Sequence, residues 1–240
     1  MSHIKVSDNT TSYSARSLRE LQFIFRQYRP VEGVAGWIYR GQADKAWPLV
    51  PKVGRPEFGS KGGSDLAMFS LWKDKAVAYE PLPDNDLECL AIAQHHGLAT
   101  RLLDWSNNPL VATYFACKEL PEKDAAIYLY YPRNLIEEER KDHRELKEIT
   151  QYIPRGIAAR ITRQSGRFTY HPNPSEEISF QEIGDPFVGQ QLKKIVIYKT
   201  AKERILDELN IYNVNEEGIF PDLDGLSRHF NWLKANKKGI

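Results

Sequence analysis

The chain has 240 residues, of which 41% are hydrophobic, 11% aromatic and 27% charged. These are ordinary globular values, and they exclude wholesale disorder and fibrous architectures. Lysine and arginine total 33 against 32 acidic residues. This balance argues against a dedicated nucleic-acid or membrane-surface protein, whose charge would lean basic.

The first residues, 1–14, are polar, and we expect them to be disordered or flexible and followed by one domain over 15–240. They hold no apolar stretch of signal-peptide length, and no later segment approaches the roughly 18 apolar residues of a membrane span. We therefore expect a cytoplasmic protein without membrane contact. Its two cysteines, Cys89 and Cys117, lie in apolar runs and are expected to be buried free thiols.

The first half of the chain reads mainly as helices. Ser17 is a candidate cap for a helix that ends near Arg29, and the run WIYRG predicts a strand at about 36–41. Residues 42–63 are so rich in Pro and Gly that most of the segment is predicted to be a loop, at the rim of a binding cleft. Further helices are predicted at about 64–79, at 86–96 after Asn85 or Asp86, and after Ser106, with Pro109 in the first turn of the last one.

The second half is richer in strands. AIYLYY predicts a strand at 126–131, and the charged stretch 135–149 is typical of a solvated helix. Further strands are predicted at 157–162, 166–171, 178–183 and 193–198, and helices at 200–210 and 222–236. Because strands and helices do not alternate strictly, this order favours an α+β fold with a mostly antiparallel split sheet flanked by helices. Neither GxGxxG nor GxxxxGK[ST] is present.

Arg40 and Gly41 form the first candidate site, at the end of a predicted strand. A guanidinium beside an unobstructed backbone suits an anionic ligand, because glycine has no Cβ to keep the ligand away. A structural ion pair beside a turn glycine is the alternative interpretation.

The block QHHGLATRLLDWSNNPLVATYFA at 94–116 is the second candidate. Asp104 lies in an apolar run and needs a partner, which Arg101 or Arg40 could supply. Ser106 at a helix N-terminus marks a place where free N–H groups could meet phosphate, unless it is only a cap. The block also holds His95 and Thr100. Neither His95 nor its neighbour has a ligand-type partner three or four residues away, so we expect no metal.

Two further segments carry polar residues. Gln164 precedes a predicted strand and could present its amide to a ligand, although a surface hairpin turn explains the segment equally well. Around 219–230, Pro221 and Asp222 indicate the start of a helix, with Asp224 in its first turn, and we interpret this segment as structural.

Together, WIYRGQ, WPLVPKVGRP, the 94–116 block, RQSGRF and IFPDLDGL resemble the FRG domain, a bacterial family named for a Phe/Tyr-Arg-Gly signature. The resemblance runs in order from about 17 to 233, and the 94–116 string is its most specific part. The layout of the family is similar to the ADP-ribosyltransferase-like superfamily, in which a split antiparallel sheet binds NAD. No Glu-x-Glu or Gln-x-Glu pair lies on a predicted strand, which departs from that superfamily.

The resemblance implies an NAD-utilising enzyme, either an ADP-ribosyltransferase or an NAD glycohydrolase, with a nucleotide as ligand; whether a protein or a nucleic acid is the acceptor stays open at this point. A bacterial toxin or an antiphage defence effector is the implied setting. The implied catalytic residues are His95, Asp104 and Gln164, and the implied NAD-binding residues are Arg40, Gly41, Thr100, Arg101 and Ser106.

Two alternatives remain open at this point. A non-catalytic module could recognise a nucleotide, nucleic acid or protein, and a nuclease or phosphotransferase could act on a phosphodiester with His95 and nearby arginines. The nuclease or phosphotransferase would use Arg40 and Arg101 beside His95. The arginines that the binding module would use are Arg40, Arg101, Arg160, Arg163 and Arg167.

Overall fold

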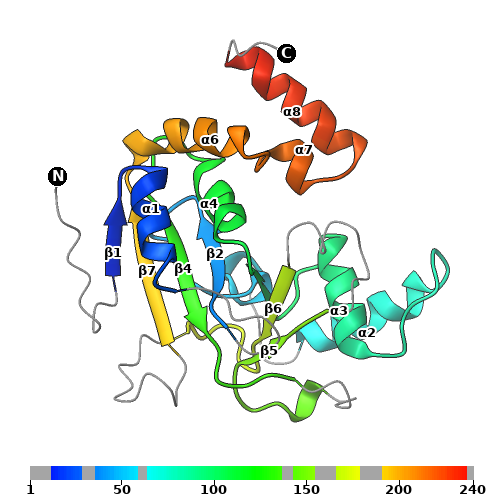
Figure 1. The fold of residues 1–240 in the computed structure, drawn as a ribbon. Helices are drawn as coiled ribbons and strands as arrows, with labels where there is room; N and C mark the ends of the chain where they lie inside the picture. Colours follow the sequence, from blue (N-terminus) through cyan, green and yellow to red (C-terminus); the bar gives the residue numbers. More distant parts are fainter. Residues whose placement is uncertain are drawn as a thin grey trace. The chain divides into compact units, whose positions relative to one another are not determined.

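A computed structural model describes residues 12–28, 36–58, 64–136, 143–154, 166–178 and 191–236. The predicted α+β class is confirmed: these residues form seven α-helices and a mixed, mostly antiparallel sheet of seven strands (Figure 1). The contacts divide the chain into two compact units. The first unit comprises 1–47, 107–133 and 179–240, and the second comprises 48–106 and 134–178.

The first unit is built on the strand order β1-β7-β4-β2. These strands are β1 (Ser12–Ala15), β7 (Gln191–Ile197), β4 (Ala125–Tyr131) and β2 (Ile38–Gln42). Only β1 and β7 run parallel, and the other two pairs are antiparallel. Strand β4 is buried over its first six residues because helices and neighbouring strands cover it.

Helices of the first unit contribute to one apolar core with these strands. Leu21 and Ile24 of α1 (Leu18–Phe25) meet Ile127 of β4 and Ile195 of β7 in this core, together with residues of α4 (Pro109–Cys117) and α6 (Lys202–Ile211). The unit ends with α7 (Glu216–Ile219) and α8 (Leu223–Ala235).

The second unit has the antiparallel strand order β3-β6-β5, formed by β3 (Leu102–Ser106), β6 (Gly166–Tyr170) and β5 (Thr150–Tyr152). Helices α2 (Ser64–Ala76) and α3 (Asp86–His95) supply the rest of its core, through residues such as Phe69 and Leu90. Short 3₁₀ helices lie at Lys52–Gly54, Pro56–Phe58 and His143–Glu145, and a fourth, in the first unit, lies at Lys199–Ala201.

Several expected helix starts are confirmed by their caps. Ser17 accepts a hydrogen bond from the backbone N–H of Glu20, Asn85 caps α3, and Asp222 caps α8 through the N–H of Gly225. Such caps are local features, since a short polar side chain satisfies N–H groups that the first helical turn leaves open.

The expected helix at 135–149 is wrong in its described part. Leu135 bridges to Gln151, a 3₁₀ turn covers His143–Glu145, and residues from Thr150 enter β5. Buried contacts outweigh the charge pattern here, because His143 is only 3% exposed and packs edge-on against the rings of Phe69 and Tyr170. The remaining residues of that helix, 137–142, lie outside the described residues, as do the strand expected at 157–162 and nearly all of the one at 178–183.

At the N-terminus, Ser12–Ala15 forms β1, and residues 1–11 lie outside the described ranges. The Pro- and Gly-rich segment contains two short 3₁₀ turns and no longer element over 43–58, in keeping with the predicted loop. No helix in the described part of the chain is long and apolar enough to cross a membrane.

Candidate functional site

Asp104 is the only exposed residue of β3. Its neighbours Leu103 and Trp105 are both buried. It shares a sheet face with Phe168, its partner across the β3–β6 ladder, and that face is covered by α3. Asp104 thus lies where the apolar contact between strand and helix ends, and its carboxylate reaches solvent.

A chain of hydrogen bonds orients this carboxylate. The side-chain amide of Gln94, in the last turn of α3, donates to Oδ1 of Asp104 at 2.6 Å. The hydroxyl of Thr100 donates to the amide oxygen of Gln94, and it accepts from the backbone N–H of Leu102 at 3.1 Å. Because Thr100 is buried, the network is anchored inside the unit and points an acidic group outward.

Arg101, one of the two partners considered for Asp104, pairs with Asp65 instead. Nε and Nη2 of Arg101 donate to the two carboxylate oxygens of Asp65, each at 2.7 Å, and Nη1 donates to the Tyr170 hydroxyl and the Pro172 carbonyl. Burial is the largest single influence on Arg101 and opposes its charge, but the hydrogen bonds and charges of Asp65 and Tyr170 together outweigh it, so the pKa of the guanidinium lies above its ordinary value.

This ion pair joins α2 to the residue just before β3, and both of its side chains are less than 10% exposed. A place for Arg101 in a cofactor site stays a prediction. Nothing in the sequence identifies Asp65 as its partner, since 36 residues separate the two.

Ser106 is the last residue of β3 and not a helix cap, which corrects the expectation. Asn108 caps α4, with its side chain accepting from the N–H of Leu110 at 2.9 Å, and Pro109 takes the first helical position. Proline at that position places the cap at the residue just before it, a signal that was available in the sequence. Ser106 therefore does not stand at a helix N-terminus, which was the reason to expect that it binds phosphate.

Gly41 lies on β2 under α4. A Cβ atom at Gly41 would stand 1.9 Å from the carbonyl oxygen of Ala112 and 2.6 Å from the backbone nitrogen of Ala116. The missing side chain thus allows the helix to approach the strand closely, which explains the glycine without a ligand. Its neighbour Arg40 is half-buried on the same strand.

His95 is the last residue of α3 and is half-buried, next to the exposed His96. The two rings are 5.1 Å apart at a steep angle of 80°, so they face different directions. His95 follows Gln94 directly, which places an imidazole one residue from the network that holds Asp104.

The expected site residues divide between the two units. Thr100 and Asp104 share one hydrogen-bonded network in the second unit, where His95 also lies, whereas Arg40 and Gly41 belong to the first. Gln164 lies outside the described residues. A single cleft that unites these residues stays a prediction.

Comparison with protein families supplies the remaining observation. Residues 35–125 match the family model described as FRG domain. The chain contains an FRG domain. No curated protein and no solved structure matches the chain.

The FRG domain match runs from just before β2 through α2, α3, β3 and α4 to the first residue of β4. It includes Arg40 and Gly41 as well as the network around Asp104, and it ends before Gln164. The residues of the network around Asp104 therefore lie within the matched segment.

Proposed function

We propose that the FRG domain of this chain uses NAD as a substrate, in the manner of an ADP-ribosyltransferase or an NAD glycohydrolase with a split antiparallel sheet. The observation that supports it best is the carboxylate of Asp104, exposed on a strand that is otherwise buried and held by Gln94. An acidic group fixed in this way is arranged before the substrate arrives, so it costs little reorganisation during the reaction.

In the proposed reaction, the bond between the ribose anomeric carbon and the nicotinamide nitrogen breaks. Positive charge develops on the ribose, and Asp104 stabilises it electrostatically. The electron pair of the broken bond leaves with nicotinamide. Water or an acceptor group then bonds to the anomeric carbon, and the neutral imidazole of His95 takes its proton.

Binding is assigned to the residues of the Arg-Gly signature and of the 100–106 segment. Arg40 would pair with the pyrophosphate, whose charge and geometry suit a guanidinium. Thr100 and Ser106 would line the pocket, and Gln164 would orient the ribose as a second candidate beside Asp104. A bacterial toxin or an antiphage effector is the proposed setting, which rests on family resemblance alone.

A second candidate function is a binding module without catalysis, for a nucleotide, nucleic acid or protein. Two contacts favour this candidate. Gly41 packs against α4, and Arg101 pairs with Asp65. Each contact explains its residue without NAD binding.

Calorimetric titration with NAD, with AMP and with a short RNA separates these functions, together with an assay for nicotinamide release. We expect NAD to bind and nicotinamide to appear. Binding of AMP or NAD without nicotinamide release would support the binding module. Tight binding of RNA followed by its cleavage would support a nuclease. Either of these two outcomes would refute the proposed reaction.

A further inference from the structure

Lys52 lies in the second unit, on a short turn whose backbone is held at two points. The turn is the 3₁₀ helix Lys52–Gly54. The backbone N–H of Val53 donates to the carbonyl oxygen of Thr100 at 3.4 Å. At Gly54, a Cβ atom would stand 1.7 Å from the carbonyl oxygen of Pro174, so the chain packs closely there. The exposed side chain of Lys52 therefore starts from a backbone that is fixed in place.

Hydrogen bonds connect Lys52 to the residue that orients Asp104. The ammonium of Lys52 donates to the carbonyl oxygen of Gly97 at 3.0 Å. The backbone N–H of Gly97 donates to the carbonyl oxygen of Gln94 at 2.9 Å, and the side chain of Gln94 donates to Asp104. Lys52 and Asp104 are therefore both attached to the same end of α3.

The positive charge of Lys52 is not neutralised by an acidic side chain. Its ammonium bonds to the carbonyl of Gly97 and lies 5.5 Å from the centre of the Phe58 ring, and both of these groups are uncharged. No carboxylate in the described part of the chain forms an ion pair with Lys52, and this includes Glu57 in the same segment. An ammonium held only by neutral groups still attracts an anion.

Two other cations of the second unit differ from Lys52 in this respect. Arg101 pairs with Asp65 at 2.7 Å, and Lys73 pairs with Asp86 at 2.6 Å. Because each of them already faces a carboxylate, an anionic ligand would have to displace that carboxylate before it could bind there.

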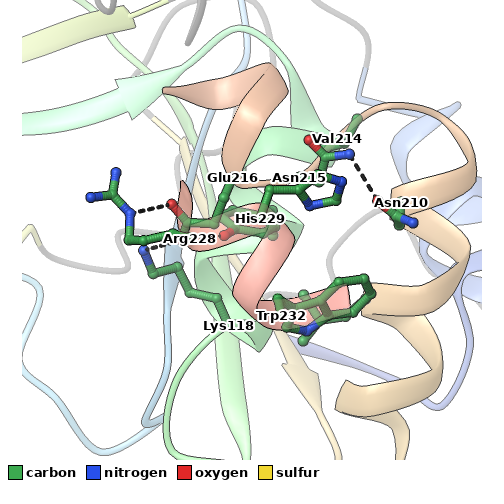
Figure 2. A pocket seen from close by; sticks show the side chains of 10 residues that line it. Lys118, Asn210, Val214, Asn215, Glu216, Arg228, His229 and Trp232 are labelled. Carbon is green, nitrogen blue, oxygen red and sulfur yellow. Dashed lines mark hydrogen bonds and ion pairs between the residues drawn. The ribbon is translucent and has the colours of Figure 1, made fainter. Parts of the chain in front are cut away.

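A pocket of about 190 Å³ in the first unit has the same balance of charges. Lys118 and Arg228 line it, and both donate to the carboxylate of Glu216, at 3.2 and 3.0 Å (Figure 2). Glu119, 3.8 Å from Lys118, adds a second negative charge. The cations of this pocket are neutralised by acidic side chains, whereas the charge of Lys52 is left for a ligand.

We propose that Lys52 binds the pyrophosphate of NAD beside Asp104, an inference that rests on the proposed use of NAD. Asp104 would act at the ribose, and Lys52 would attract the phosphates that follow the ribose in the dinucleotide. A pyrophosphate carries charge on both of its phosphates and accepts more than one cation, so this role adds to that of Arg40. The contact with Lys52 is made equally before and during the reaction, so it contributes to binding and not to turnover.

Lys52→Gln tests this assignment, because glutamine still donates a hydrogen bond to Gly97 but carries no charge. Lys75→Gln makes the same change at an exposed position of α2 and is the control. Melting curves check that both variants are folded. Nicotinamide release by the full chain is measured with NAD and with nicotinamide riboside, which has the same bond to nicotinamide but no phosphate. For Lys52→Gln we expect a KM for NAD about tenfold higher, an unchanged kcat and unchanged constants for nicotinamide riboside.

Calorimetric titration with ADP-ribose measures the same contact without catalysis, because ADP-ribose keeps the pyrophosphate and lacks nicotinamide. Lys52→Gln should bind ADP-ribose about tenfold more weakly than Lys75→Gln does. Equal affinities of the two variants, no binding of ADP-ribose by the wild type, or an unchanged KM for NAD would overturn the role of Lys52. A wild-type chain that releases no nicotinamide would refute the proposed reaction instead, and the titration with ADP-ribose would still decide whether Lys52 binds a pyrophosphate.

Discussion

Adding one methyl group at Gly41 tests whether this glycine serves helix packing or ligand contact. In Gly41→Ala, the new Cβ would meet the carbonyl oxygen of Ala112 at 1.9 Å, where ordinary contact begins at 3.4 Å. Helix α4 must therefore recede by about 1.5 Å, because the obstructing atoms are backbone and cannot rotate away. Its apolar residues would then lose contacts with β2 and β4.

The expected cost is about 3 kcal/mol, at the upper end for overpacked cores. For a chain of this length, that lowers the melting temperature by about 6–12 °C. Differential scanning calorimetry on Gly41→Ala measures the shift, with Ser12→Ala at an exposed position of β1 as the control. A melting temperature within about 2 °C of the wild type, together with weaker NAD binding, would refute the packing role and assign Gly41 to the ligand.

Three further changes test the internal polar contacts. Asp65→Ala should cost about 3–5 kcal/mol in urea denaturation, because it leaves the buried guanidinium of Arg101 without its carboxylate; a loss below about 1 kcal/mol would contradict the ion pair's role. Lys202→Met should be similarly destabilising, because the buried ammonium donates to four backbone carbonyls at 2.6–3.3 Å. An unchanged melting temperature would show that those carbonyls find other donors. Burial raises the pKa of Cys117 from 9.0 to about 12, so its contribution to stability is present below pH 9.0 and is lost as pH rises toward about 12. Cys117→Ala should reduce the alkaline fall in unfolding free energy by about 1.4 kcal/mol per pH unit, and an unchanged slope would show that the thiol ionises when folded.

Local sequence signals predicted much of the fold. The caps at Ser17, Asn85 and Asp222 depend on a few neighbouring residues, and the apolar run of β4 needs no partner to be recognised. The error at Ser106 arose because two possible caps lie close together, and the position of Pro109 decides between them.

Contacts between distant segments account for what the sequence did not reveal. The partner of Arg101 is Asp65, on a helix that is far away along the chain, and only the fold brings them together. Gly41 reads as a ligand-binding glycine until α4 is seen to lie on it. In retrospect, Ala112 and Ala116 are a signal, because small residues four apart on one helix face permit close packing. The 3-residue strand β5 is too short for its pattern to be distinctive.

The candidate site was predicted in its composition but not in its contacts. Thr100 and Asp104 do belong to one network, yet the residue that joins them is Gln94, which stands at the start of the 94–116 block. Its importance depends on the last turn of α3 lying beside β3, which no local pattern encodes.

The most direct measurement of the proposed function is nicotinamide release by Asp104→Asn, with thermal unfolding recorded on the same sample. This variant keeps the shape of the side chain and removes its charge, and Asp74→Asn makes the same change at an exposed position of α2. We predict that Asp104→Asn lowers turnover by about 10²–10³-fold, the order for losing one electrostatic contact to a transition state, while its melting temperature stays near that of Asp74→Asn. Turnover equal to that of Asp74→Asn, or a parallel fall in turnover and melting temperature, would contradict the assignment of Asp104 as the carboxylate that acts on NAD.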